Sequence, residues 1–289
     1  PPTPIELPGF HLRTRGHARQ ISLAAQASHD ILVICDSDMR VEPHYLKAIC
    51  APLQDPSLGL VTCLYRGEQA ESVSALLESL YIGATFAPSV LVARRYLRMG
   101  FALGATMVVR RRELERIGGF AAIADYLADD YELGARIAAL GKRVHLSHCV
   151  VCTVLGATTF RDHWQRGVRW LKCARVSRPL EYPTLLLTFS TPLALLEALL
   201  TGFSTTGSVL LFVSLLVRWF VLYLASSYTG DRIIRQAWLW LPLRDLLTAG
   251  QWLAAGLGRQ VVWRGSRYLL DDGGRLRACL PPQAERAAR

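Results

Sequence analysis

Several patterns are missing from this sequence, and each absence removes a class of protein. Basic residues are not gathered into a stripe with interleaved aromatic residues, so no RNA- or DNA-binding module is indicated. Cys149 and Cys152 have CxxC spacing, but no second pair accompanies them, and they lie in a β-branched run. We interpret this segment as a buried strand rather than as a metal or redox site. The seven cysteines are scattered and odd in number, which indicates a reduced domain that faces the cytosol.

Negative charge is also scarce. The 33 Lys and Arg residues outnumber the 23 Asp and Glu residues, and the net charge of +10 suggests anionic partners such as nucleotide phosphates and acidic lipid head groups. The length of 289 residues suffices for one α/β domain plus membrane segments. A hydrophobic content of 51% with a mean hydropathy of +0.23 fits uneven apolar runs better than a soluble globular protein.

Short apolar runs alternate with helical patterns in the first 160 residues. The run at residues 31–35 is continuously apolar, which is typical of a central parallel strand that is buried on both faces. The alternation of strands with helices favours a parallel sheet with helical crossovers. Further strands are expected at residues 60–65, 104–109 and 143–154, and helical segments at 21–27, 42–53, 72–98 and 113–117.

Asp36 and Asp38 stand directly after the first of these strands. In open α/β sheets, ligands bind outside the carboxyl ends of the strands. Two carboxylates that are one residue apart at such an end can share a hard divalent cation, which in turn holds a nucleotide diphosphate. The plainer interpretation is a polar turn with two capping aspartates, and the motif by itself does not decide between the two.

Asp129 and Asp130 open a second informative stretch. An apolar periodicity follows them that is typical of a short helix closed by Gly141. A helix N-terminus favours negative charge, so both carboxylates can stay ionised there. A pair of aspartates at this position can equally be only a helix cap.

Gln165, Arg166 and Arg169 lie within about one helical turn, with Trp170 beside them. Arginines at this spacing suit a diphosphate, because the planar guanidinium group matches phosphate oxygens in a bidentate manner. An arginine-rich turn can also be a solvated or membrane-facing surface. Neither this motif nor the aspartate pair supports a function alone, but together with the upstream carboxylates they do.

Taken in order, the motifs resemble those of a known family. The chain is similar to a family 2 glycosyltransferase of the ceramide-glucosyltransferase type, and in particular to the bacterial hopanoid-biosynthesis glycosyltransferases. The resemblance runs from about Gly16 to Arg275, and it is specific as a set although each member alone is weak. The strings that carry it are Asp36-x-Asp38, Asp129-Asp130-Tyr131, Gln165-x-x-x-Arg169-Trp170, Leu241-Pro-Leu-Arg-Asp245 and Val262-Trp-Arg-Gly265.

The resemblance implies an α/β fold of GT-A type, which is Rossmann-like with a mostly parallel sheet and helices on both faces, followed by C-terminal membrane helices. It implies a membrane-bound enzyme that moves glucose or N-acetylglucosamine from a UDP-sugar to a lipid hydroxyl, with inversion at the anomeric carbon. A hopanoid polyol is favoured over ceramide as the acceptor. The expected location is the bacterial inner membrane, with the catalytic domain on the cytosolic side.

The resemblance also implies roles for the carboxylates. Asp130 would be the catalytic base that accepts the proton of the acceptor hydroxyl. Asp129 is the second candidate for that role, and the residues alone do not separate the two. Asp38, with Asp36 close by, would hold Mg²⁺ or Mn²⁺ and through it the donor diphosphate.

The remaining site residues are cationic or aromatic. Arg166 or Arg169 would neutralise the charge that develops on the diphosphate. Gln165 and Trp170 would line the sugar or acceptor side. The family has a Gly-x-x-Lys element that contacts the nucleotide, and here Arg19, in Gly16-His17-Ala18-Arg19, takes the place of the lysine.

Two apolar runs in the C-terminal third, residues 183–200 and 209–225, are each long enough to span a bilayer as a helix. Arg218 lies within the second run and costs about 3 kcal/mol, which a dozen apolar residues at about 0.3–0.6 kcal/mol each outweigh. We therefore predict two transmembrane helices within residues 183–229. An amphipathic interfacial helix at residues 161–182 would admit the lipid acceptor from the bilayer.

Residues 238–257 carry Arg244 and Asp245 at their middle, and the two charges cancel about all that the apolar residues contribute. A third span would also export an arginine-rich tail against the positive-inside rule. We predict that this stretch lies in the interface or re-enters, with its tryptophans at head-group level. The chain then divides into a catalytic domain at residues 1–160, the interfacial helix, the two spans, and residues 230–289 as an interfacial or re-entrant segment with a basic tail.

The chain begins at Pro1 and no signal peptide is visible in it. The resembling family has an earlier strand whose aspartate holds the uracil, and an N-terminal membrane span. We therefore expect this chain to begin after both.

Other functions share some of these features. A processive synthase of the cellulose or chitin type is one alternative, but such enzymes carry a larger channel of membrane helices. A dolichol- or undecaprenyl-phosphate sugar transferase is another, and these usually lack the Gln-x-x-x-Arg-Trp element. The non-enzymatic alternative is a membrane scaffold whose aspartates are merely caps. The sequence indicates no oligomeric state.

Overall fold

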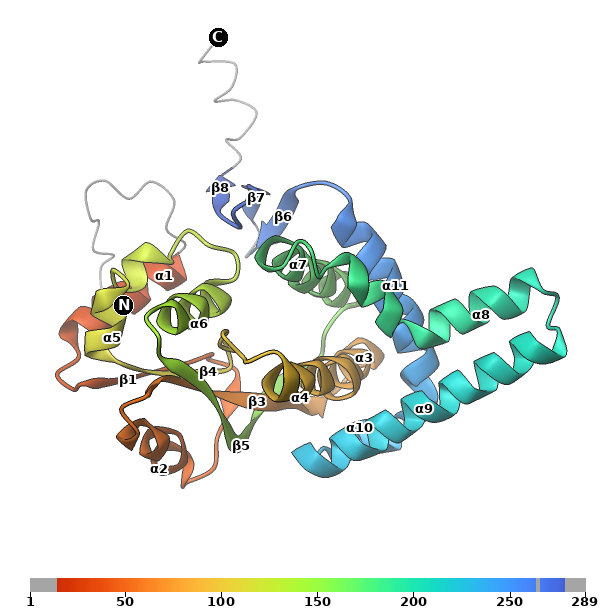
Figure 1. Ribbon diagram of the computed structural model, residues 1–289, viewed down its shortest axis with the longest axis horizontal. Coiled ribbons are helices and arrows are strands. Elements are labelled where there is room, and N and C mark those ends of the chain that lie inside the picture. The colour runs from red at the N-terminus through yellow and green to blue at the C-terminus, as the bar shows by residue number, and fades with distance from the viewer. Residues whose placement is uncertain (1–14, 264–265, 279–289) are drawn as a thin grey trace, which may run out of the picture.

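Asp36 and Asp38 lie between the first two strands of a five-stranded sheet, and Asp129 and Asp130 begin a helix that packs on it (Figure 1). The computed structural model of this chain describes residues 15–263 and 266–278. Side chains are described for residues 21–262 and 266–278. The strands are β1 (Ile31–Cys35), β2 (Met39–Arg40), β3 (Leu58–Ala70), β4 (Thr106–Arg110) and β5 (Arg143–Gly156). They lie in the order β1-β4-β3-β5-β2, with β3 and β5 parallel and the other three pairings antiparallel.

The expected mostly parallel sheet is therefore wrong, because a single parallel pairing occurs in the described sheet. The run at residues 31–35 was expected to be a central parallel strand, but in the described part of the chain β1 has one neighbour, β4, and pairs with it antiparallel. Its side chains are apolar because Leu32 and Ile34 pack into one core cluster and Ile31 packs against another. A continuous apolar run indicates that both faces of a strand are covered, but it does not indicate whether the strand pairs parallel or antiparallel.

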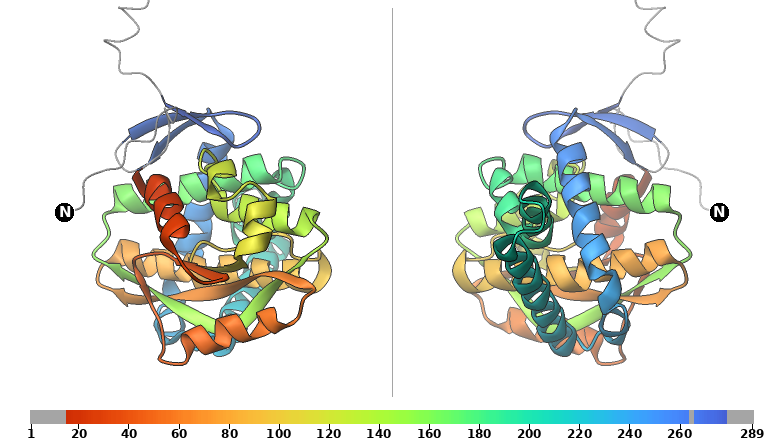
Figure 2. Two further views of the ribbon diagram at one scale, coloured as in Figure 1. Left: turned by 90° about the vertical axis from the view of Figure 1, so that its left-hand side faces the viewer. Right: turned by 90° about the vertical axis from the view of Figure 1, so that its right-hand side faces the viewer.

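Helices cover both faces of the sheet, as expected. They are α1 (Arg15–Gln26), α5 (Arg111–Arg116) and α6 (Asp129–Ala139) on one face and α2 (Tyr45–Cys50) on the other (Figure 2). Leu60 and Val109 belong to the core on the first face, and Val61 and Val108 to the core on the second. This alternation is what the two-residue period of a strand requires. The two cores fix the sheet at the point where the aspartates meet.

The segment at residues 72–98 is helical, as expected, with an interruption near Pro88. It consists of α3 (Val73–Tyr81), a π-helical turn η2 (Ile82–Phe86) and α4 (Ala87–Tyr96). Pro88 has no N–H to donate to the carbonyl of Ala84 one turn before it, so that carbonyl loses its helical partner. The Nη1 atom of Arg218 donates to the same carbonyl at 2.9 Å. An arginine from a distant helix thus completes the hydrogen bonding of the turn.

The C-terminal part is helical. It contains α7 (Phe160–Ser177), a 3₁₀ turn η4 (Pro183–Thr188), α8 (Ser190–Leu200), α9 (Thr205–Thr229), α10 (Arg232–Gln236), a 3₁₀ turn η5 (Trp238–Trp240) and α11 (Leu241–Gly256). Residues 183–200 do not form one continuous helix, which corrects the first predicted span: α8 has 11 residues and a length of about 16 Å, against about 30 Å for a hydrocarbon core. The break lies at Phe189, between η4 and α8, and hydropathy alone does not predict it.

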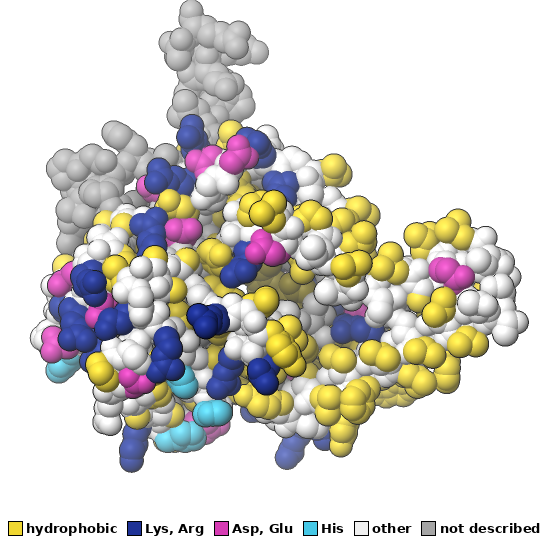
Figure 3. All heavy atoms as spheres, viewed as in Figure 1, with side chains coloured by type: hydrophobic (Ala, Val, Ile, Leu, Met, Phe, Trp, Pro, Cys, Tyr) yellow, Lys and Arg dark blue, Asp and Glu magenta, His cyan; other side chains and the backbone are white. Residues whose placement is uncertain are grey.

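Among the described residues, two helical stretches are long and apolar enough to cross a membrane by length and composition. One is α9, which has 25 residues and a mean hydropathy of 2.1, and whose apolar part is 11% buried. The other is residues 73–96, whose apolar part is 56% buried. α8 and α9 form a hairpin that projects from the body, and hydrophobic side chains cover both arms (Figures 1 and 3). The exposed apolar residues of the hairpin include Leu196, Leu199, Leu200, Phe203, Phe212, Val213, Val217 and Phe220. A continuous apolar surface of this kind marks an interaction site.

Arg218 and Asp245, from two of the apolar C-terminal runs, form an ion pair. The guanidinium of Arg218 donates to both carboxylate oxygens of Asp245, at 2.8 and 2.7 Å. Thr191 of α8 donates to the same carboxylate at 2.9 Å. Arg244 is 1% exposed and Asp245 6% exposed, so the charges of residues 238–257 are buried between helices. The predicted interfacial or re-entrant position of this stretch stays a prediction.

A second, three-stranded sheet lies within the predicted basic tail and was not foreseen from the sequence. Its strands are β6 (Gln260–Trp263), β7 (Ser266–Leu270) and β8 (Leu276–Ala278), and both pairings are antiparallel. It lies beside α7 and the segment that precedes α6 (Figure 1). Part of the Val262-Trp-Arg-Gly265 string falls outside the described residues.

The close approach of α6 to the loop before β4 gives a first prediction. A Cβ atom on Gly134 would lie 2.4 Å from the backbone nitrogen of Ala102 and 2.5 Å from the carbonyl carbon of Phe101. Gly134→Ala should therefore push the helix and the loop apart and lower the free energy of unfolding by about 1–3 kcal/mol. Thermal unfolding in detergent measures this.

Gly256→Ala is the matched control, because its Cβ would meet only the Tyr182 hydroxyl at 3.9 Å, an ordinary contact. A Gly134→Ala protein as stable as this control would show that the backbone contact does not constrain α6.

Candidate active site

The loop before β4 is held by a buried threonine. Thr62 on β3 is 0% exposed, and its Oγ1 accepts a hydrogen bond from the N–H of Leu103 at 3.0 Å and donates to the carbonyl of Thr106 at 2.7 Å. The N–H of Thr106 also donates to the carbonyl of Leu103. The turn between these residues is thereby fixed, and the N–H of Gly104 points to a carboxylate on α6.

That carboxylate belongs to Asp130. Its Oδ2 accepts from the N–H of Gly104 at 2.9 Å, and its Oδ1 accepts from the N–H of Tyr131 at 2.7 Å. The N–H of Asp130 donates in turn to Oδ1 of Asp129 at 3.0 Å. Burial, with the charges of Asp129 and Asp36, raises the pKa of Asp130 to about 7, against the opposing effect of the two N–H donors. A carboxyl group with such a pKa can exchange a proton at neutral pH.

Asp36 borders the same space. A Cβ atom on Gly104 would lie 3.4 Å from Oδ2 of Asp130 and 3.5 Å from Oδ2 of Asp36. The end of β1 and the start of α6 therefore bring these two carboxylates together, although they are far apart in the chain. Glycine at this position leaves the space between them open.

Asp38 is exposed, and the contacts described for it are of its backbone: its carbonyl accepts from the N–H of Val154 at 2.9 Å. The described residues contain no cluster of three or more His, Cys, Asp or Glu side chains that could hold a metal ion by itself. Mg²⁺ in nucleotide enzymes is held by one or two carboxylates plus substrate phosphates. The oxygen donors of Asp36 and Asp38, with the negative charge that gathers at Asp130, fit that kind of site.

The predicted cationic residues lie on α7, whose N-cap Thr159 accepts a hydrogen bond from the N–H of Asp162. Arg166 is ion-paired with Glu78 of α3. Arg169 is half-buried and makes no hydrogen bond or ion pair within the described part of the chain. Gln165 is half-buried on the same helix.

The charges of Arg169 and of the two aspartates of α6 all act on one buried thiol, that of Cys173. Burial raises the pKa of the Cys173 thiol to about 12, the charge of Arg169 opposes this shift, and the charges of Asp130 and Asp129 add to it. The Cys173 thiol is thus affected by the charges of the Arg169 guanidinium and of the Asp129 and Asp130 carboxylates. Trp170, the next residue, stacks on Tyr81 of α3 with ring centroids 5.6 Å apart and an interplanar angle of 16°.

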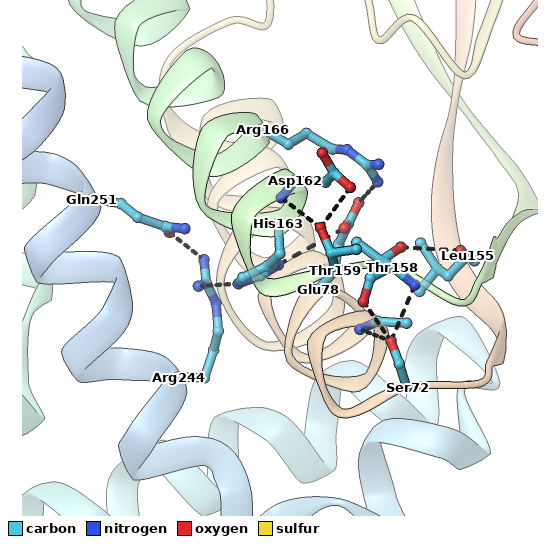
Figure 4. Close-up of polar contacts among 11 residues, drawn as sticks. Ser72, Glu78, Leu155, Thr158, Thr159, Asp162, His163, Arg166, Arg244 and Gln251 are labelled. Atoms are coloured by element: carbon cyan, nitrogen blue, oxygen red, sulfur yellow. Dashed lines mark hydrogen bonds and ion pairs between the residues drawn. The ribbon is translucent and has the colours of Figure 1, made fainter.

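A buried polar cluster anchors α7, and it was not foreseen from the sequence (Figure 4). Glu78 contacts Arg166 and lies 3.8 Å from Nδ1 of His163. The Nε2 of His163 is 3.1 Å from Arg244 of α11, which also donates to Gln251 at 3.0 Å. The partners are separated by 81 and 88 residues in the chain, so no local spacing predicts them. The available signal was the presence of Glu78 and Arg244 inside otherwise apolar segments.

Arg19, the predicted nucleotide contact, belongs to α1, but its side chain lies outside the described residues. A cavity of about 180 Å³ lies between α1 and the sheet, and its lining includes Ile21, Leu32 and Phe120. It is almost entirely apolar and touches none of the site aspartates. The convergence of the carboxylates, and not this cavity, defines the candidate site.

Comparisons with known proteins agree with an enzyme that transfers sugars. Residues 18–276 match the family model of glycosyl transferase family 21. Among solved structures, glucosyl-3-phosphoglycerate synthase from Mycobacterium tuberculosis in complex with phosphoglyceric acid has 18% identity and a TM-score of 0.33, over 59% of this chain and 56% of that one. The structure of S. aureus TarS 1–349 in complex with UDP-GlcNAc has 11% identity and a TM-score of 0.32, over 91% and 79%.

A mycobacterial protein with 19% identity and a TM-score of 0.32 is covered over 54% of its length, so this chain spans about half the length of the first matched structures. Overlaps this weak do not establish a shared activity. The family match does not reproduce the expected family 2 assignment, but it confirms the expected class of enzyme. Since the match spans nearly the whole chain, the protein belongs to glycosyl transferase family 21.

Proposed function

We propose that this chain is a membrane-bound, inverting glycosyltransferase that moves glucose or N-acetylglucosamine from a UDP-sugar to a lipid hydroxyl. The observation that carries the proposal is the meeting of Asp36 and Asp130 on either side of Gly104. Arg169 and Asp130 both act electrostatically on the Cys173 thiol. An acceptor hydroxyl requires a base, and a sugar diphosphate requires positive charge around it. The site offers groups for both.

Asp130 is the base in this proposal. The acceptor oxygen attacks the anomeric carbon, its proton passes to the Asp130 carboxylate, and the bond to the UDP oxygen breaks on the opposite face of the sugar. Asp130 is favoured over Asp129 because two backbone N–H groups hold its oxygens and its pKa is near neutrality. The Asp129 carboxylate accepts from the N–H of Asp130 and so orders the first turn of α6.

Asp38 and Asp36 hold the divalent cation, Mg²⁺ or Mn²⁺, through which the donor diphosphate is bound. When bound, the cation neutralises negative charge on the departing UDP. Arg169 supplies protein charge to the same diphosphate, since it has no carboxylate partner among the described residues, whereas Arg166 is paired with Glu78. Removing an electrostatic donor of this kind typically costs about 10²–10³-fold in turnover.

Trp170 and Gln165 line the sugar or acceptor side, and Arg19 contacts the nucleotide. The stacking of Trp170 on Tyr81 supports its part, because it presents a fixed aromatic edge next to Arg169. Gln165 lies on the same helix, half-buried. The role of Arg19 comes from the sequence resemblance alone.

The acceptor is a lipid, in bacteria a hopanoid polyol, and ceramide is the alternative. The exposed apolar surface of the α8–α9 hairpin supports a membrane location, because such a surface is costly in water. The pairing of Arg218 with Asp245 supports it further, since these two opposite charges neutralise each other within the protein. We retain the division into a cytosolic catalytic domain at residues 1–160, an interfacial helix at 161–182, a membrane region at 183–229 and the remainder at 230–289, in the bacterial inner membrane.

The alternatives are weaker. A processive synthase requires a larger set of membrane helices than the two apolar stretches found in the described residues. A polyprenyl-phosphate sugar transferase usually lacks the element that ends in Arg169 and Trp170. A scaffold without activity is disfavoured by the match to a glycosyltransferase family.

Transfer itself tests the proposal. Detergent-solubilised protein is mixed with Mn²⁺, UDP-glucose or UDP-N-acetylglucosamine, and vesicles that contain bacteriohopanepolyol or ceramide, and products are identified by mass spectrometry. We expect one glycolipid product, and the activity should stay in the membrane pellet after an alkaline wash of the source membranes. Asp130→Asn should lower turnover by about 10²–10⁴-fold with UDP binding retained. The absence of any glycolipid, or full activity of Asp130→Asn, contradicts the proposal.

The pKa of Asp130 gives a pH dependence with a definite sign. A base acts when ionised, and because the pKa of Asp130 is raised to about 7, protonation removes the base as the pH falls through that value. We expect kcat/KM to rise about tenfold between roughly pH 6 and pH 8 and then to level off. An aspartate with an ordinary pKa near 4 would give a flat profile over this range. A flat profile therefore removes Asp130 from the role of base.

The two arginines of α7 should behave differently. Arg169→Ala should lower kcat by about 100-fold with a smaller effect on the acceptor KM, because its charge acts on the leaving diphosphate. Arg166→Ala leaves the buried Glu78 carboxylate without its ion-pair partner and should mainly lower the thermal midpoint. Equal losses of kcat in two well-folded variants would contradict this assignment.

A further inference from the structure

We propose that the C-terminal sheet β6–β8 positions the catalytic aspartates, and that Tyr126 and Arg275 are the positioning residues of this contact. The proposal rests on the proposed function in one respect, the catalytic part assigned to Asp130. The sheet does not touch Asp130 in any described contact. It acts on Asp125, Tyr126 and Leu127, which precede the Asp129–Asp130 pair and form the leader of α6.

The backbone of this leader is paired with the turn into β8. The N–H of Leu127 donates to the carbonyl of Gly274 at 2.9 Å, and the N–H of Leu276 donates to the carbonyl of Asp125 at 2.7 Å. Tyr126 and Arg275 face each other as an antiparallel bridge between these two bonds. The loop that connects η3 (Phe120–Ala122) to α6 is thereby held by an isolated β-bridge. Backbone that is paired in this way opens less readily than a free loop.

The side chains strengthen the bridge. The Nε of Arg275 donates to the Tyr126 hydroxyl at 3.1 Å, and its guanidinium lies 5.3 Å from the centre of the Tyr126 ring. The guanidinium of Arg136, from α6 itself, lies 5.1 Å from the same ring. Tyr126 is therefore held by cations from the C-terminal sheet and from the helix that carries Asp130.

An apolar cluster lies beneath the bridge. Leu127 is 5% exposed and packs with Val261, Leu270 and Leu276, one residue from each strand of the sheet, each 5% exposed or less. Burying a leucine of this kind contributes roughly 1.5–3 kcal/mol. The leucine two positions before Asp129 is thus fixed in the core of the C-terminal sheet.

The same sheet is bound to α7. The Nζ of Lys172 donates to the carbonyl of Gln260 at 2.6 Å, and Arg175 donates to the carbonyls of Gly256 and Gly258, both at 2.8 Å. Cys173 and Val176 of α7 pack against the apolar cluster. The sheet therefore joins the segment that bears Asp129 and Asp130 to the helix that bears Arg169.

This arrangement has a consequence for catalysis. Asp130 is held in place by the N–H of Gly104, and that bond requires the first turn of α6 to stay where it is. Loosening the leader would let this turn move and admit water to the carboxylate. A displacement of about 1 Å at a reacting group can cost about 100-fold in rate.

The test uses the whole chain with Arg275→Ala and Tyr126→Phe, and Arg267→Ala as the matched control. Arg267 is exposed on β7 of the same sheet, with no side-chain contact in the described residues. We expect Arg275→Ala to lower kcat by about tenfold or more with the donor KM unchanged. Arg267→Ala should leave both parameters at the wild-type value. Arg275→Lys, which keeps the cation near the ring, should restore part of kcat.

One further measurement separates positioning from plain stability. Hydrogen–deuterium exchange of residues 125–131 should rise about tenfold in Arg275→Ala, while the thermal midpoint changes by roughly 2 °C or less.

Exchange that rises only within residues 260–278, together with a kcat equal to that of Arg267→Ala, overturns the proposal. So does a loss of kcat that follows the loss of folded protein in all variants. If the wild-type protein transfers no sugar at all, the proposed function fails, and the exchange of residues 125–131 still decides whether the sheet orders this segment.

Discussion

The candidate site depends on one constraint, which is that several carboxylates are held close together in a partly buried place. Asp130 lies beside Asp129 and Asp36, and burial with these charges raises its pKa to about 7. Two backbone N–H groups offset part of that cost, and one of them, from Gly104, belongs to a loop that Thr62 fixes. Repelling carboxylates stay together only if the backbone around them cannot relax. The close packing of α6 on this loop supplies the rigidity.

A second set of charges organises the apolar half of the molecule. Arg218 joins α9 to Asp245 of α11, and its guanidinium also satisfies the carbonyl that Pro88 leaves free in the π-helical turn. A buried ion pair is costly unless its geometry is good and its remaining donors are satisfied, and here both conditions hold. The hairpin is thus attached to the body through polar contacts on its inner side, while its outer side stays apolar.

Features that depend on residues close together in the chain could be predicted from the sequence. Features that depend on contacts between distant residues could not. The positions of β1, β3, β4 and β5 followed from apolar runs, whereas the three strands of the C-terminal sheet did not. The rule that sites form at strand ends singled out Asp36 and Asp38. That Asp36 would meet Asp130 was implied by the family resemblance and not by this rule. The direction of β1 was missed because burial of both faces does not depend on pairing direction. The break before α8 was missed because hydropathy measures composition and not backbone continuity. Contacts such as His163 with Arg244 join residues 81 positions apart, and no local pattern reports them.

The long-range contacts also explain how a single helix can serve the site. α7 is held at its first turns by the cluster around Glu78 and at its last turns by the C-terminal sheet. Arg169 lies between these two anchors. A helix fixed at both ends cannot tilt without breaking buried polar contacts at one of them, so the backbone at Arg169 is held from both sides. The second anchor also holds the leader of α6, so the helix that bears Arg169 and the segment that leads into Asp130 share one support.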